Sequence, residues 1–505
     1  MMPAARGLTG SSATRRIVAA ALAVCGLMLL GAAPGWAKGS IAWHGCGPKQ
    51  PANLQCGELS VPLDYHHRHG AKITLGFNRL PAADPAHRVG SLIVNPGGPG
   101  GPGSFFVAVE AAGGHLWNPA LHKRFDMIGM DPRGVGTSTP IQCNPHAYNE
   151  LASRLFPSTE AHFDRLASSA RAFGQSCLKR TGPLLAHVDT RSAARDMEAL
   201  RRALGDGKLN YLGLSYGAHL GSAYAELYPK RIRTMALDAI ANHSISVKTV
   251  FADAAATYED TLNRFAEWCA QTSSCPLHGR DVLALFDSVV QRADQQPIPA
   301  QKCADGSCRP TVTGGEIRME ALFLLVTKDG VPAAGLPSWK DFAIALARAD
   351  QGDASGLSPE LATSPLEFAG LAINCADYPR EIVTYEDFVA TTRLGLGVAP
   401  HTRGASEAWL GFLACMRWPV PVTYRPHSIM VRGAPRILLV GATHDPETNY
   451  VWARELLNQM PSAVLLTRDG DGHTSSWLHN SRTSDAIAHY LVTRQTPPPN
   501  TVYSD

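Results

Sequence analysis

The stretch Leu209-Asn210-Tyr211-Leu212-Gly213-Leu214-Ser215-Tyr216-Gly217 decides the fold of this 505-residue chain. Its last five residues have the G-x-S-x-G form of a nucleophile elbow, in which a strand turns sharply into a helix. The turn strains the backbone at Ser215, so the residues two before and two after it must lack bulk. The elbow then presents the Ser215 hydroxyl above the positive end of the next helix and leaves the Tyr216 N–H free to bind an oxyanion.

A pentapeptide of this kind also occurs by chance as a Gly-rich turn with an ordinary serine. Its surroundings favour the elbow, because an amphipathic helix over 191–204, a short strand and a helix over 218–228 ended by Pro229 enclose the motif. The sequence therefore predicts that Ser215 is a nucleophile.

A nucleophilic serine needs a general base, and the base needs an acid that orients it. The strand predicted at 435–440 leads into Thr443-His444-Asp445-Pro446-Glu447-Thr448, and the strand at 463–467 leads into Asp469-Gly470-Asp471-Gly472-His473. Both segments follow the carboxyl ends of strands, on the sheet edge that carries Ser215. We predict Asp445 as the acid and His473 as the base. His444, Glu447, Asp469 and Asp471 are the competing candidates, and His219 is expected to pack or to line the pocket.

The loop Asn95-Pro96-Gly97-Gly98-Pro99-Gly100-Gly101-Pro102-Gly103 follows a buried strand at 90–94. Its lack of side chains lets backbone N–H groups approach a ligand closely. It lacks the Lys-Ser/Thr ending of a phosphate-binding loop, which argues against nucleotide binding. We predict that Gly98 and Tyr216 donate the two hydrogen bonds of an oxyanion hole.

Strands alternate with helices on both sides of the elbow, which predicts an α/β fold with a mostly parallel sheet and helices on both faces. The order Ser, Asp, His along the chain is that of the α/β-hydrolases. Between 240 and 431 helical periodicity replaces this alternation, which predicts a large helical lid inserted before the last two strands. The expected parts are a signal peptide (1–37), a core (38–239), the lid (240–431) and the rest of the core (432–505), with a frayed tail from 497.

The turn after the strand at 125–130 carries Asp131 and Arg133. These two residues could serve as catalytic acid and base. We instead expect a structural ion pair between them that braces the turn beside the elbow.

The first 37 residues have three arginines before an apolar run that ends in Gly35-Trp36-Ala37, the pattern of a secretory signal peptide. Without them the 46 basic residues fall to 43, against 43 acidic ones. A mature chain of neutral charge gives no indication of nucleic acid binding, and the short apolar run gives none of stable membrane insertion. We expect a secreted or periplasmic protein without a cofactor.

Ten cysteines follow the apolar run, and an even number in an exported chain predicts disulfides. Sequence alone does not fix their connectivity, and pairing of nearest neighbours is the simplest scheme. Cys303 and Cys308 could instead form half of a metal site, but no second pair follows at zinc spacing. The nearest-neighbour pairs are Cys46–Cys56, Cys143–Cys177, Cys269–Cys275, Cys303–Cys308 and Cys375–Cys415.

Taken together, the motifs at 95–103, 125–138, 211–217, 443–448 and 469–475 resemble those of secreted tripeptidyl aminopeptidases, relatives of the prolyl aminopeptidases with the α/β-hydrolase fold. The resemblance covers nearly all of the chain after the signal peptide, including a C-terminal region like theirs. It implies Ser215, Asp445 and His473 as the catalytic triad and a peptide with a free N-terminus as substrate. This sequence differs from the family at Pro102 and at Ala218-His219, but neither difference removes a catalytic group.

Release of short N-terminal peptides requires acids that hold the substrate ammonium, and we expect them in the lid. The candidates are Asp377, Glu316 and Glu320. Two other functions are compatible with the same motifs: an esterase or amidase for small acyl compounds, and a binding protein that has kept the fold but lost catalysis.

Overall fold

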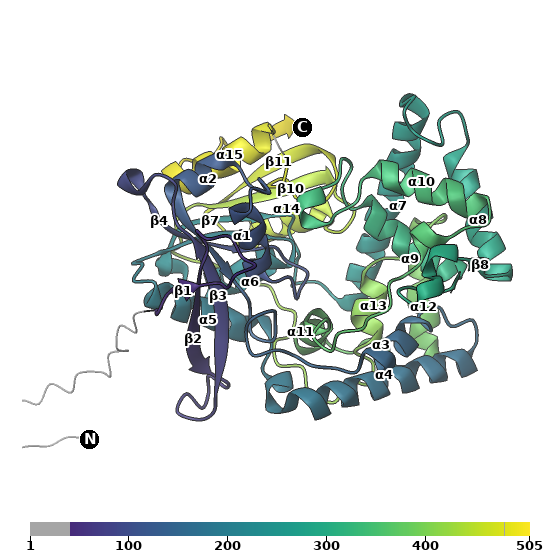
Figure 1. Cartoon of the computed structure of the whole chain (residues 1–505), viewed down its shortest axis with the longest axis horizontal. Helices are drawn as coiled ribbons and strands as arrows, with labels where there is room; N and C mark the ends of the chain where they lie inside the picture. The colour runs from purple at the N-terminus through teal and green to yellow at the C-terminus, as the bar shows by residue number, and fades with distance from the viewer. Residues whose placement is uncertain (1–40, 479) are drawn as a thin grey trace, which may run out of the picture. The chain divides into compact units, whose positions relative to one another are not determined.

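The computed structural model describes residues 41–505 except 479 (Figure 1). The predicted signal peptide lies outside the described residues. No helix within the described part of the chain is long and apolar enough to cross a membrane.

A ten-stranded sheet forms the centre of the described structure, in the order β1-β2-β3-β5-β4-β6-β7-β10-β11-β12. The first four of these strands pair antiparallel, and every pair from β5 to β12 is parallel. This order confirms the predicted α/β fold with a mainly parallel sheet. The strands are β1 (His44–Gly45), β2 (Gln55–Pro62), β3 (Lys72–Leu80), β4 (Gly90–Asn95), β5 (Phe125–Met130), β6 (Leu209–Leu214), β7 (Ile232–Asp238), β10 (Ile437–His444), β11 (Ala463–Asp471) and β12 (Thr501–Ser504).

Helices cover both faces of this sheet, because successive side chains of each strand point to opposite faces. In β4, Ile93 belongs to the hydrophobic cluster on one face, whereas Leu92 and Val94 belong to the cluster on the other. The first face packs against α5 (Thr190–Ala203), α6 (Tyr216–Leu227) and α14 (Tyr450–Gln459), and the second against α1 (Gly103–Ala111), α2 (Pro119–Arg124) and α15 (Arg482–Thr493).

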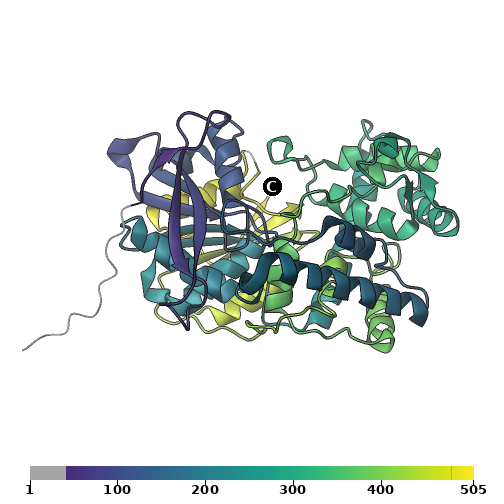
Figure 2. The same ribbon diagram turned by 60° about the horizontal axis from the view of Figure 1, so that its bottom comes forward.

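A helical region joins the sheet between β7 and β10 (Figures 1 and 2). It is built from α7 (Val247–Gln271), α8 (Val282–Gln295), α9 (Gly314–Leu325), α10 (Trp339–Asp350), α11 (Ala369–Asp377), α12 (Tyr385–Val398) and α13 (Ala408–Leu413), with a small hairpin of β8 (Ile298–Pro299) and β9 (Thr311–Val312).

Two helices from the first half of the chain pack onto this region as well. They are α3 (Pro145–Ala152) and α4 (Glu160–Thr181), which the sequence analysis assigned to the core. Phe163 of α4 lies with its ring centroid 6.0 Å from that of Tyr385 and 5.7 Å from that of Phe388, both in α12. The helical region is therefore built from two segments of the chain, one between β5 and β6 and one between β7 and β10.

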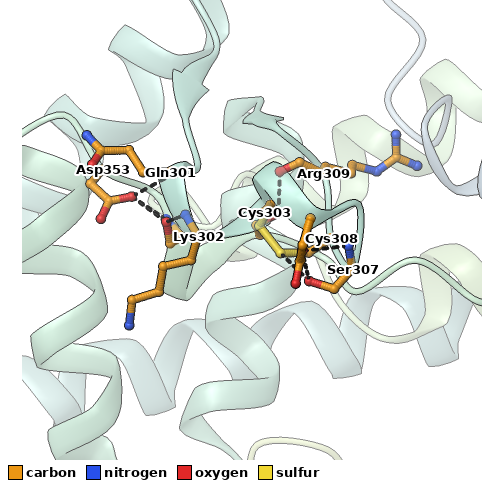
Figure 3. The surroundings of a disulfide bond; sticks show 10 residues. Gln301, Lys302, Cys303, Ser307, Cys308, Arg309 and Asp353 are labelled. Carbon is orange, nitrogen blue, oxygen red and sulfur yellow. Dashed lines mark hydrogen bonds between the residues drawn. A yellow bond between two sulfur atoms is a disulfide. The ribbon is translucent and has the colours of Figure 1, made fainter.

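All five predicted disulfides are present, so the nearest-neighbour scheme is confirmed. Figure 3 shows Cys303 bonded to Cys308 in the segment before β9. The Ser307 hydroxyl in this segment donates to the Asp305 carboxylate at 2.7 Å. The alternative of half a metal site is therefore wrong for these two cysteines. Each of the five bonds closes a loop of 5 to 40 residues.

Two sequence predictions are wrong. Thr501–Ser504 is not frayed but pairs with β11 as the parallel strand β12, and the Asp505 carboxylate accepts hydrogen bonds from Ser481 and Thr483 at the start of α15. Asp131 and Arg133 also have other partners than each other, as described next.

Arg133 forms its ion pair with Asp196 of α5, with its Nε 2.7 Å from the carboxylate. The Asp131 carboxylate instead accepts hydrogen bonds from Ser104 and Thr137. The two side chains thus have different partners: Arg133 pairs with α5, and Asp131 bonds Ser104 of α1 and Thr137 of its own loop. Both residues are fully buried and brace the turn, as expected, by separate contacts.

Candidate active site

Ser215 occupies a strained turn between β6 and α6. Its φ of 58° and ψ of −124° lie in a region that non-glycine residues rarely adopt. The two flanking glycines permit this turn, since a Cβ on Gly213 would lie 2.3 Å from the Gly217 carbonyl oxygen and a Cβ on Gly217 would lie 2.6 Å from the Asn95 carbonyl oxygen. The Ser215 N–H donates to the carbonyl oxygen of Asp238 at 2.9 Å, which fastens the turn to β7.

The Gly-rich loop after β4 lies directly against the elbow. A Cβ on Gly97 would be 2.8 Å from the Ser215 Cβ and 3.1 Å from the Tyr216 nitrogen, so only glycine fits there. Gly97 and Gly98 have φ values of 100° and 109°, which glycine adopts without strain. Gly98 and Tyr216 line the same cavity as Ser215. Gly98 and Tyr216 therefore lie beside Ser215, where their backbone N–H groups could bind an oxyanion.

His473 and Asp445 form a buried pair. The His473 Nδ1 lies 2.8 and 2.9 Å from the two carboxylate oxygens of Asp445. Asp445 also accepts hydrogen bonds from the backbone N–H groups of Glu447 and Thr448 and from the Thr448 hydroxyl. Burial raises the pKa of Asp445, but His473 and these hydrogen bonds outweigh it and keep that pKa below its usual value. Asp445 is thus ionised and fixes the tautomer in which Nδ1 carries a proton.

The other ring nitrogen of His473, Nε2, faces a second carboxylate. It lies 3.1 Å from Oε2 of Glu447, and within the described residues it has no partner with hydrogen-bond geometry. Burial lowers the pKa of His473, but the carboxylates of Asp445 and Glu447 outweigh it and raise that pKa to about 10. In this structure the imidazole ring is therefore held between two acids.

Two buried side chains, Arg468 and Asp238, hold the backbone of the loop that carries His473. The Arg468 guanidinium donates to the carbonyl oxygens of Asp471, Gly472 and Thr474. The Asp238 carboxylate accepts from the backbone N–H groups of residues 475 and 476 at 2.8 and 2.7 Å. Asp238 therefore contacts both the elbow, through its carbonyl oxygen, and the histidine loop, through its side chain.

The helical region also touches this loop. The carbonyl oxygen of Val326, just after α9, accepts the His473 N–H at 2.8 Å. Two residues further on, the Lys328 ammonium lies 2.7 Å from the carboxylate of Asp471, which also pairs with Arg264. The loop that carries His473 is thus held both by the sheet and by the helical region.

A cavity opens beside Ser215 between the elbow and helices α11 and α13. Its wall is mostly apolar or aromatic, with Val250, Tyr378, Phe412 and Trp452 among its members. Its polar side chains include Asp377, Glu407 and His219. An apolar cleft with a few polar side chains is the usual form of a site for a small molecule or a chain end.

Asp377, one of the three predicted amine ligands, is fully buried at this cavity. Its carboxylate accepts hydrogen bonds from the Thr190 N–H at 3.0 Å and from the Thr190 hydroxyl at 2.6 Å. Burial raises the pKa of Asp377 to about 7. His219 lies 3.7 Å from it, and burial lowers the pKa of that histidine to about 3, so the imidazole is neutral.

The other two predicted amine ligands are not among the residues that line this cavity. Glu316 closes a capping box with Thr313 at the start of α9 and pairs with Arg309 at 2.8 Å. Glu320 lies one turn further along α9, where burial and the neighbouring Glu316 raise its pKa to about 7. Both residues therefore lie in α9, outside the cavity beside Ser215.

Glu407, just before α13, is an acid that is not among the amine ligands predicted from the sequence. It lines the cavity with Ser215, and its side chain is exposed. Burial and the nearby Glu447 raise the pKa of Glu407 to about 8. Its neighbour in space, Glu447, lies 40 residues later in the chain, so no local sequence pattern predicts that Glu407 belongs to this site.

Comparisons with known proteins agree with this architecture. The family described as alpha/beta hydrolase fold matches residues 90–291, and the family described as TAP-like protein matches residues 402–503. Together with the fold, these matches define the chain as a serine hydrolase of the α/β-hydrolase fold.

Three relatives with curated names place it more closely. The chain is 33% identical over 477 residues to serine protease Hip1 of Mycobacterium tuberculosis, covering 89% of this chain and 87% of the relative. It is 30% identical over 481 residues to tripeptidyl aminopeptidase of Streptomyces lividans (91% and 86%) and 32% identical over 479 residues to carboxylesterase B of Mycobacterium tuberculosis (90% and 88%). The chain belongs to the tripeptidyl aminopeptidase-like family of α/β-hydrolases.

Proposed function

We propose that this protein is an aminopeptidase that releases short peptides, tripeptides among them, from free N-termini through an acyl-enzyme on Ser215. The observation that carries the proposal is the cavity beside Ser215, because it combines an apolar wall with the carboxylates of Asp377 and Glu407. An ammonium group is the part of a peptide that such carboxylates select. The names of two relatives, a serine protease and a tripeptidyl aminopeptidase, support the same reaction class.

The proposed chemistry assigns one role to each residue of the site. Ser215 Oγ attacks the carbonyl carbon while His473 Nε2 takes the hydroxyl proton, and the carbonyl π electrons move to the oxygen. The backbone N–H groups of Gly98 and Tyr216 stabilise that oxyanion. When the intermediate collapses, the C–N bond breaks and His473 returns the proton to the leaving amine. Water then releases the acyl group by the same steps, and Asp445 orients the imidazole throughout.

We assign Glu407, with Asp377 deeper in the cavity, to the substrate ammonium. Glu407 is the better placed of the two, because its carboxylate is open to the cavity whereas both oxygens of Asp377 are engaged by Thr190. Glu316 and Glu320 are not part of this proposal, since neither lines the cavity.

The test is product analysis on a library of peptides with free N-termini and on its N-acetylated counterpart. We expect fragments of fixed length from the free-amine library, little cleavage of the acetylated one, and no cleavage by Ser215→Ala. Equal cleavage of both libraries would refute amine recognition and favour an esterase or amidase. The similarity to a carboxylesterase makes that the second candidate.

We further propose that the protein works outside the cytoplasm. The five disulfides support this location, because such bonds persist in oxidising compartments. Sequencing the N-terminus of protein recovered from the culture medium or periplasm tests it. We expect the mature chain to begin at Lys38, after the predicted cleavage site, and an intact N-terminus in the cytoplasmic fraction would contradict the proposal.

A further inference from the structure

Glu447 contacts the one atom of the catalytic base that the reaction must leave free. Its Oε2 lies 3.1 Å from Nε2 of His473, while Nδ1 of the same ring is held by Asp445. The His473 side chain is 5% exposed and that of Glu447 is 21% exposed, so little water separates the two groups. Nε2 is the nitrogen that takes the Ser215 proton in the proposed mechanism.

A carboxylate at this position opposes that proton transfer. An imidazole flanked by two carboxylates favours its doubly protonated form, and an imidazolium ion cannot accept the serine proton. Asp445 and Glu447, from the loop after β10, contact His473, and the charge of Glu407, just before α13, also raises the pKa of that histidine. Of these, Asp445 is fixed by four hydrogen-bond donors, so the other two are free to respond to a ligand.

We propose that Glu447 restrains His473 in the ligand-free protein, and that the ammonium group of a free N-terminus releases the base by pairing with Glu447 and Glu407. The inference rests on the proposed aminopeptidase function and deepens it, because it makes Glu447 a residue that determines specificity. A substrate with a free amine is then favoured twice: it binds more tightly, and it makes His473 able to accept the Ser215 proton.

The proton balance of this release is simple. In the ligand-free protein the His473 ring is doubly protonated, with its Nδ1 proton toward Asp445 and its Nε2 proton toward Glu447. When the substrate ammonium supplies the positive charge beside Glu447, the Nε2 proton of His473 leaves to solvent. The neutral ring keeps its Nδ1 proton toward Asp445, and Nε2 can accept the proton of Ser215. An N-acetylated substrate brings no charge and leaves His473 protonated.

Glu447→Ala tests this inference because it should change two substrates in opposite directions. On a free-amine peptide substrate we expect kcat/KM to fall about thirtyfold, as when one partner of a half-buried charge pair is removed. On the N-acetylated form of the same substrate we expect kcat/KM at neutral pH to rise, by about tenfold for each unit by which the pKa of His473 falls. The acid limb of the pH profile on the acetylated substrate should move to lower pH.

Asp469→Asn is the matched control. Asp469 lies on the same strand end as the His473 loop, and its exposed carboxylate bonds Thr443 rather than His473. This variant removes one negative charge from the same sheet edge, so it should leave both substrates and the acid limb unchanged. A change in Glu447→Ala of the same sign on both substrates, or an unmoved acid limb, would overturn the inference.

Labelling of Ser215 by a fluorophosphonate separates this inference from the proposed function. The labelling rate depends on His473 as base but not on recognition of a peptide. If the protein fails to cleave any free-amine peptide, the proposed function is wrong, yet the labelling rate still shows whether Glu447 restrains His473. We expect Glu447→Ala to label faster than the unmodified protein below neutral pH, and equal rates would overturn the restraint.

Discussion

Removal of the Cys375–Cys415 disulfide should cost both stability and activity. Cys375 lies in α11 between Asn374 and Asp377, and Cys415 follows α13, which begins beside Glu407. Asn374, Asp377 and Glu407 all line the cavity beside Ser215. The bond therefore ties together the two helices that form the wall of the proposed amine site.

The expected loss of stability follows from the length of the loop that each disulfide closes. The Cys375–Cys415 bond has a sequence separation of 40 residues, and that loop predicts a loss of about 4 kcal/mol of unfolding free energy in the double alanine variant. The Cys303–Cys308 bond has a separation of 5 residues, which predicts about 2 kcal/mol. Alanine is preferred to serine because a buried hydroxyl without a partner adds its own cost.

The assay is urea unfolding of both double variants, together with kcat and KM on a free-amine substrate at a temperature where both are folded. We expect Cys375→Ala with Cys415→Ala to lose about twice the free energy of the control pair. We also expect it to show a raised KM, while Cys303→Ala with Cys308→Ala keeps the original KM. Equal losses of stability, or an unchanged KM in the first variant, would refute this account of the bond.

Three further changes test the site directly. Gly97→Ala places a Cβ against Ser215 and Tyr216 at a φ of 100°, so we expect kcat to fall about 10²–10³-fold, as when an oxyanion donor is lost, with folding checked by circular dichroism. Asp445→Asn should lower kcat about 10⁴-fold through the wrong tautomer of His473, and a loss below tenfold would point to another acid. Because the pKa of Glu407 is raised to about 8, KM for free-amine substrates should fall as the carboxylate begins to ionise between about pH 6 and pH 7, below the pH at which the substrate amine loses its own proton. Glu407→Gln should abolish that pH dependence, and its persistence would assign the titration to another group.

Sequence patterns predicted the sheet well because its signals are local. Buried strands are short runs of mostly apolar residues, and β5 spans the same residues, 125–130, as the strand predicted there, whereas β4 extends one residue beyond the predicted 90–94. The elbow was predictable for the same reason, since the glycines that the turn requires lie within two residues of Ser215. The disulfides followed from proximity along the chain, which limits how far two cysteines can separate.

The parts that sequence did not predict depend on partners that are distant in the chain. Arg133 pairs with Asp196, 63 residues away, rather than with its near neighbour Asp131. The strand Thr501–Ser504 has few apolar residues, and only its pairing with β11 makes it a strand. Glu407 and Glu320 look alike in sequence, since both are acids in helical segments. Only the arrangement of α9 and α13 shows which of them lines the cavity.

The hydrogen bond from the His473 N–H to the Val326 carbonyl oxygen has a consequence for catalysis. Any movement of Val326 away from the sheet must break this bond and so loosen the segment that carries His473. A substitution that displaces the end of α9 is therefore expected to slow hydrolysis, although no residue of α9 lines the cavity beside Ser215.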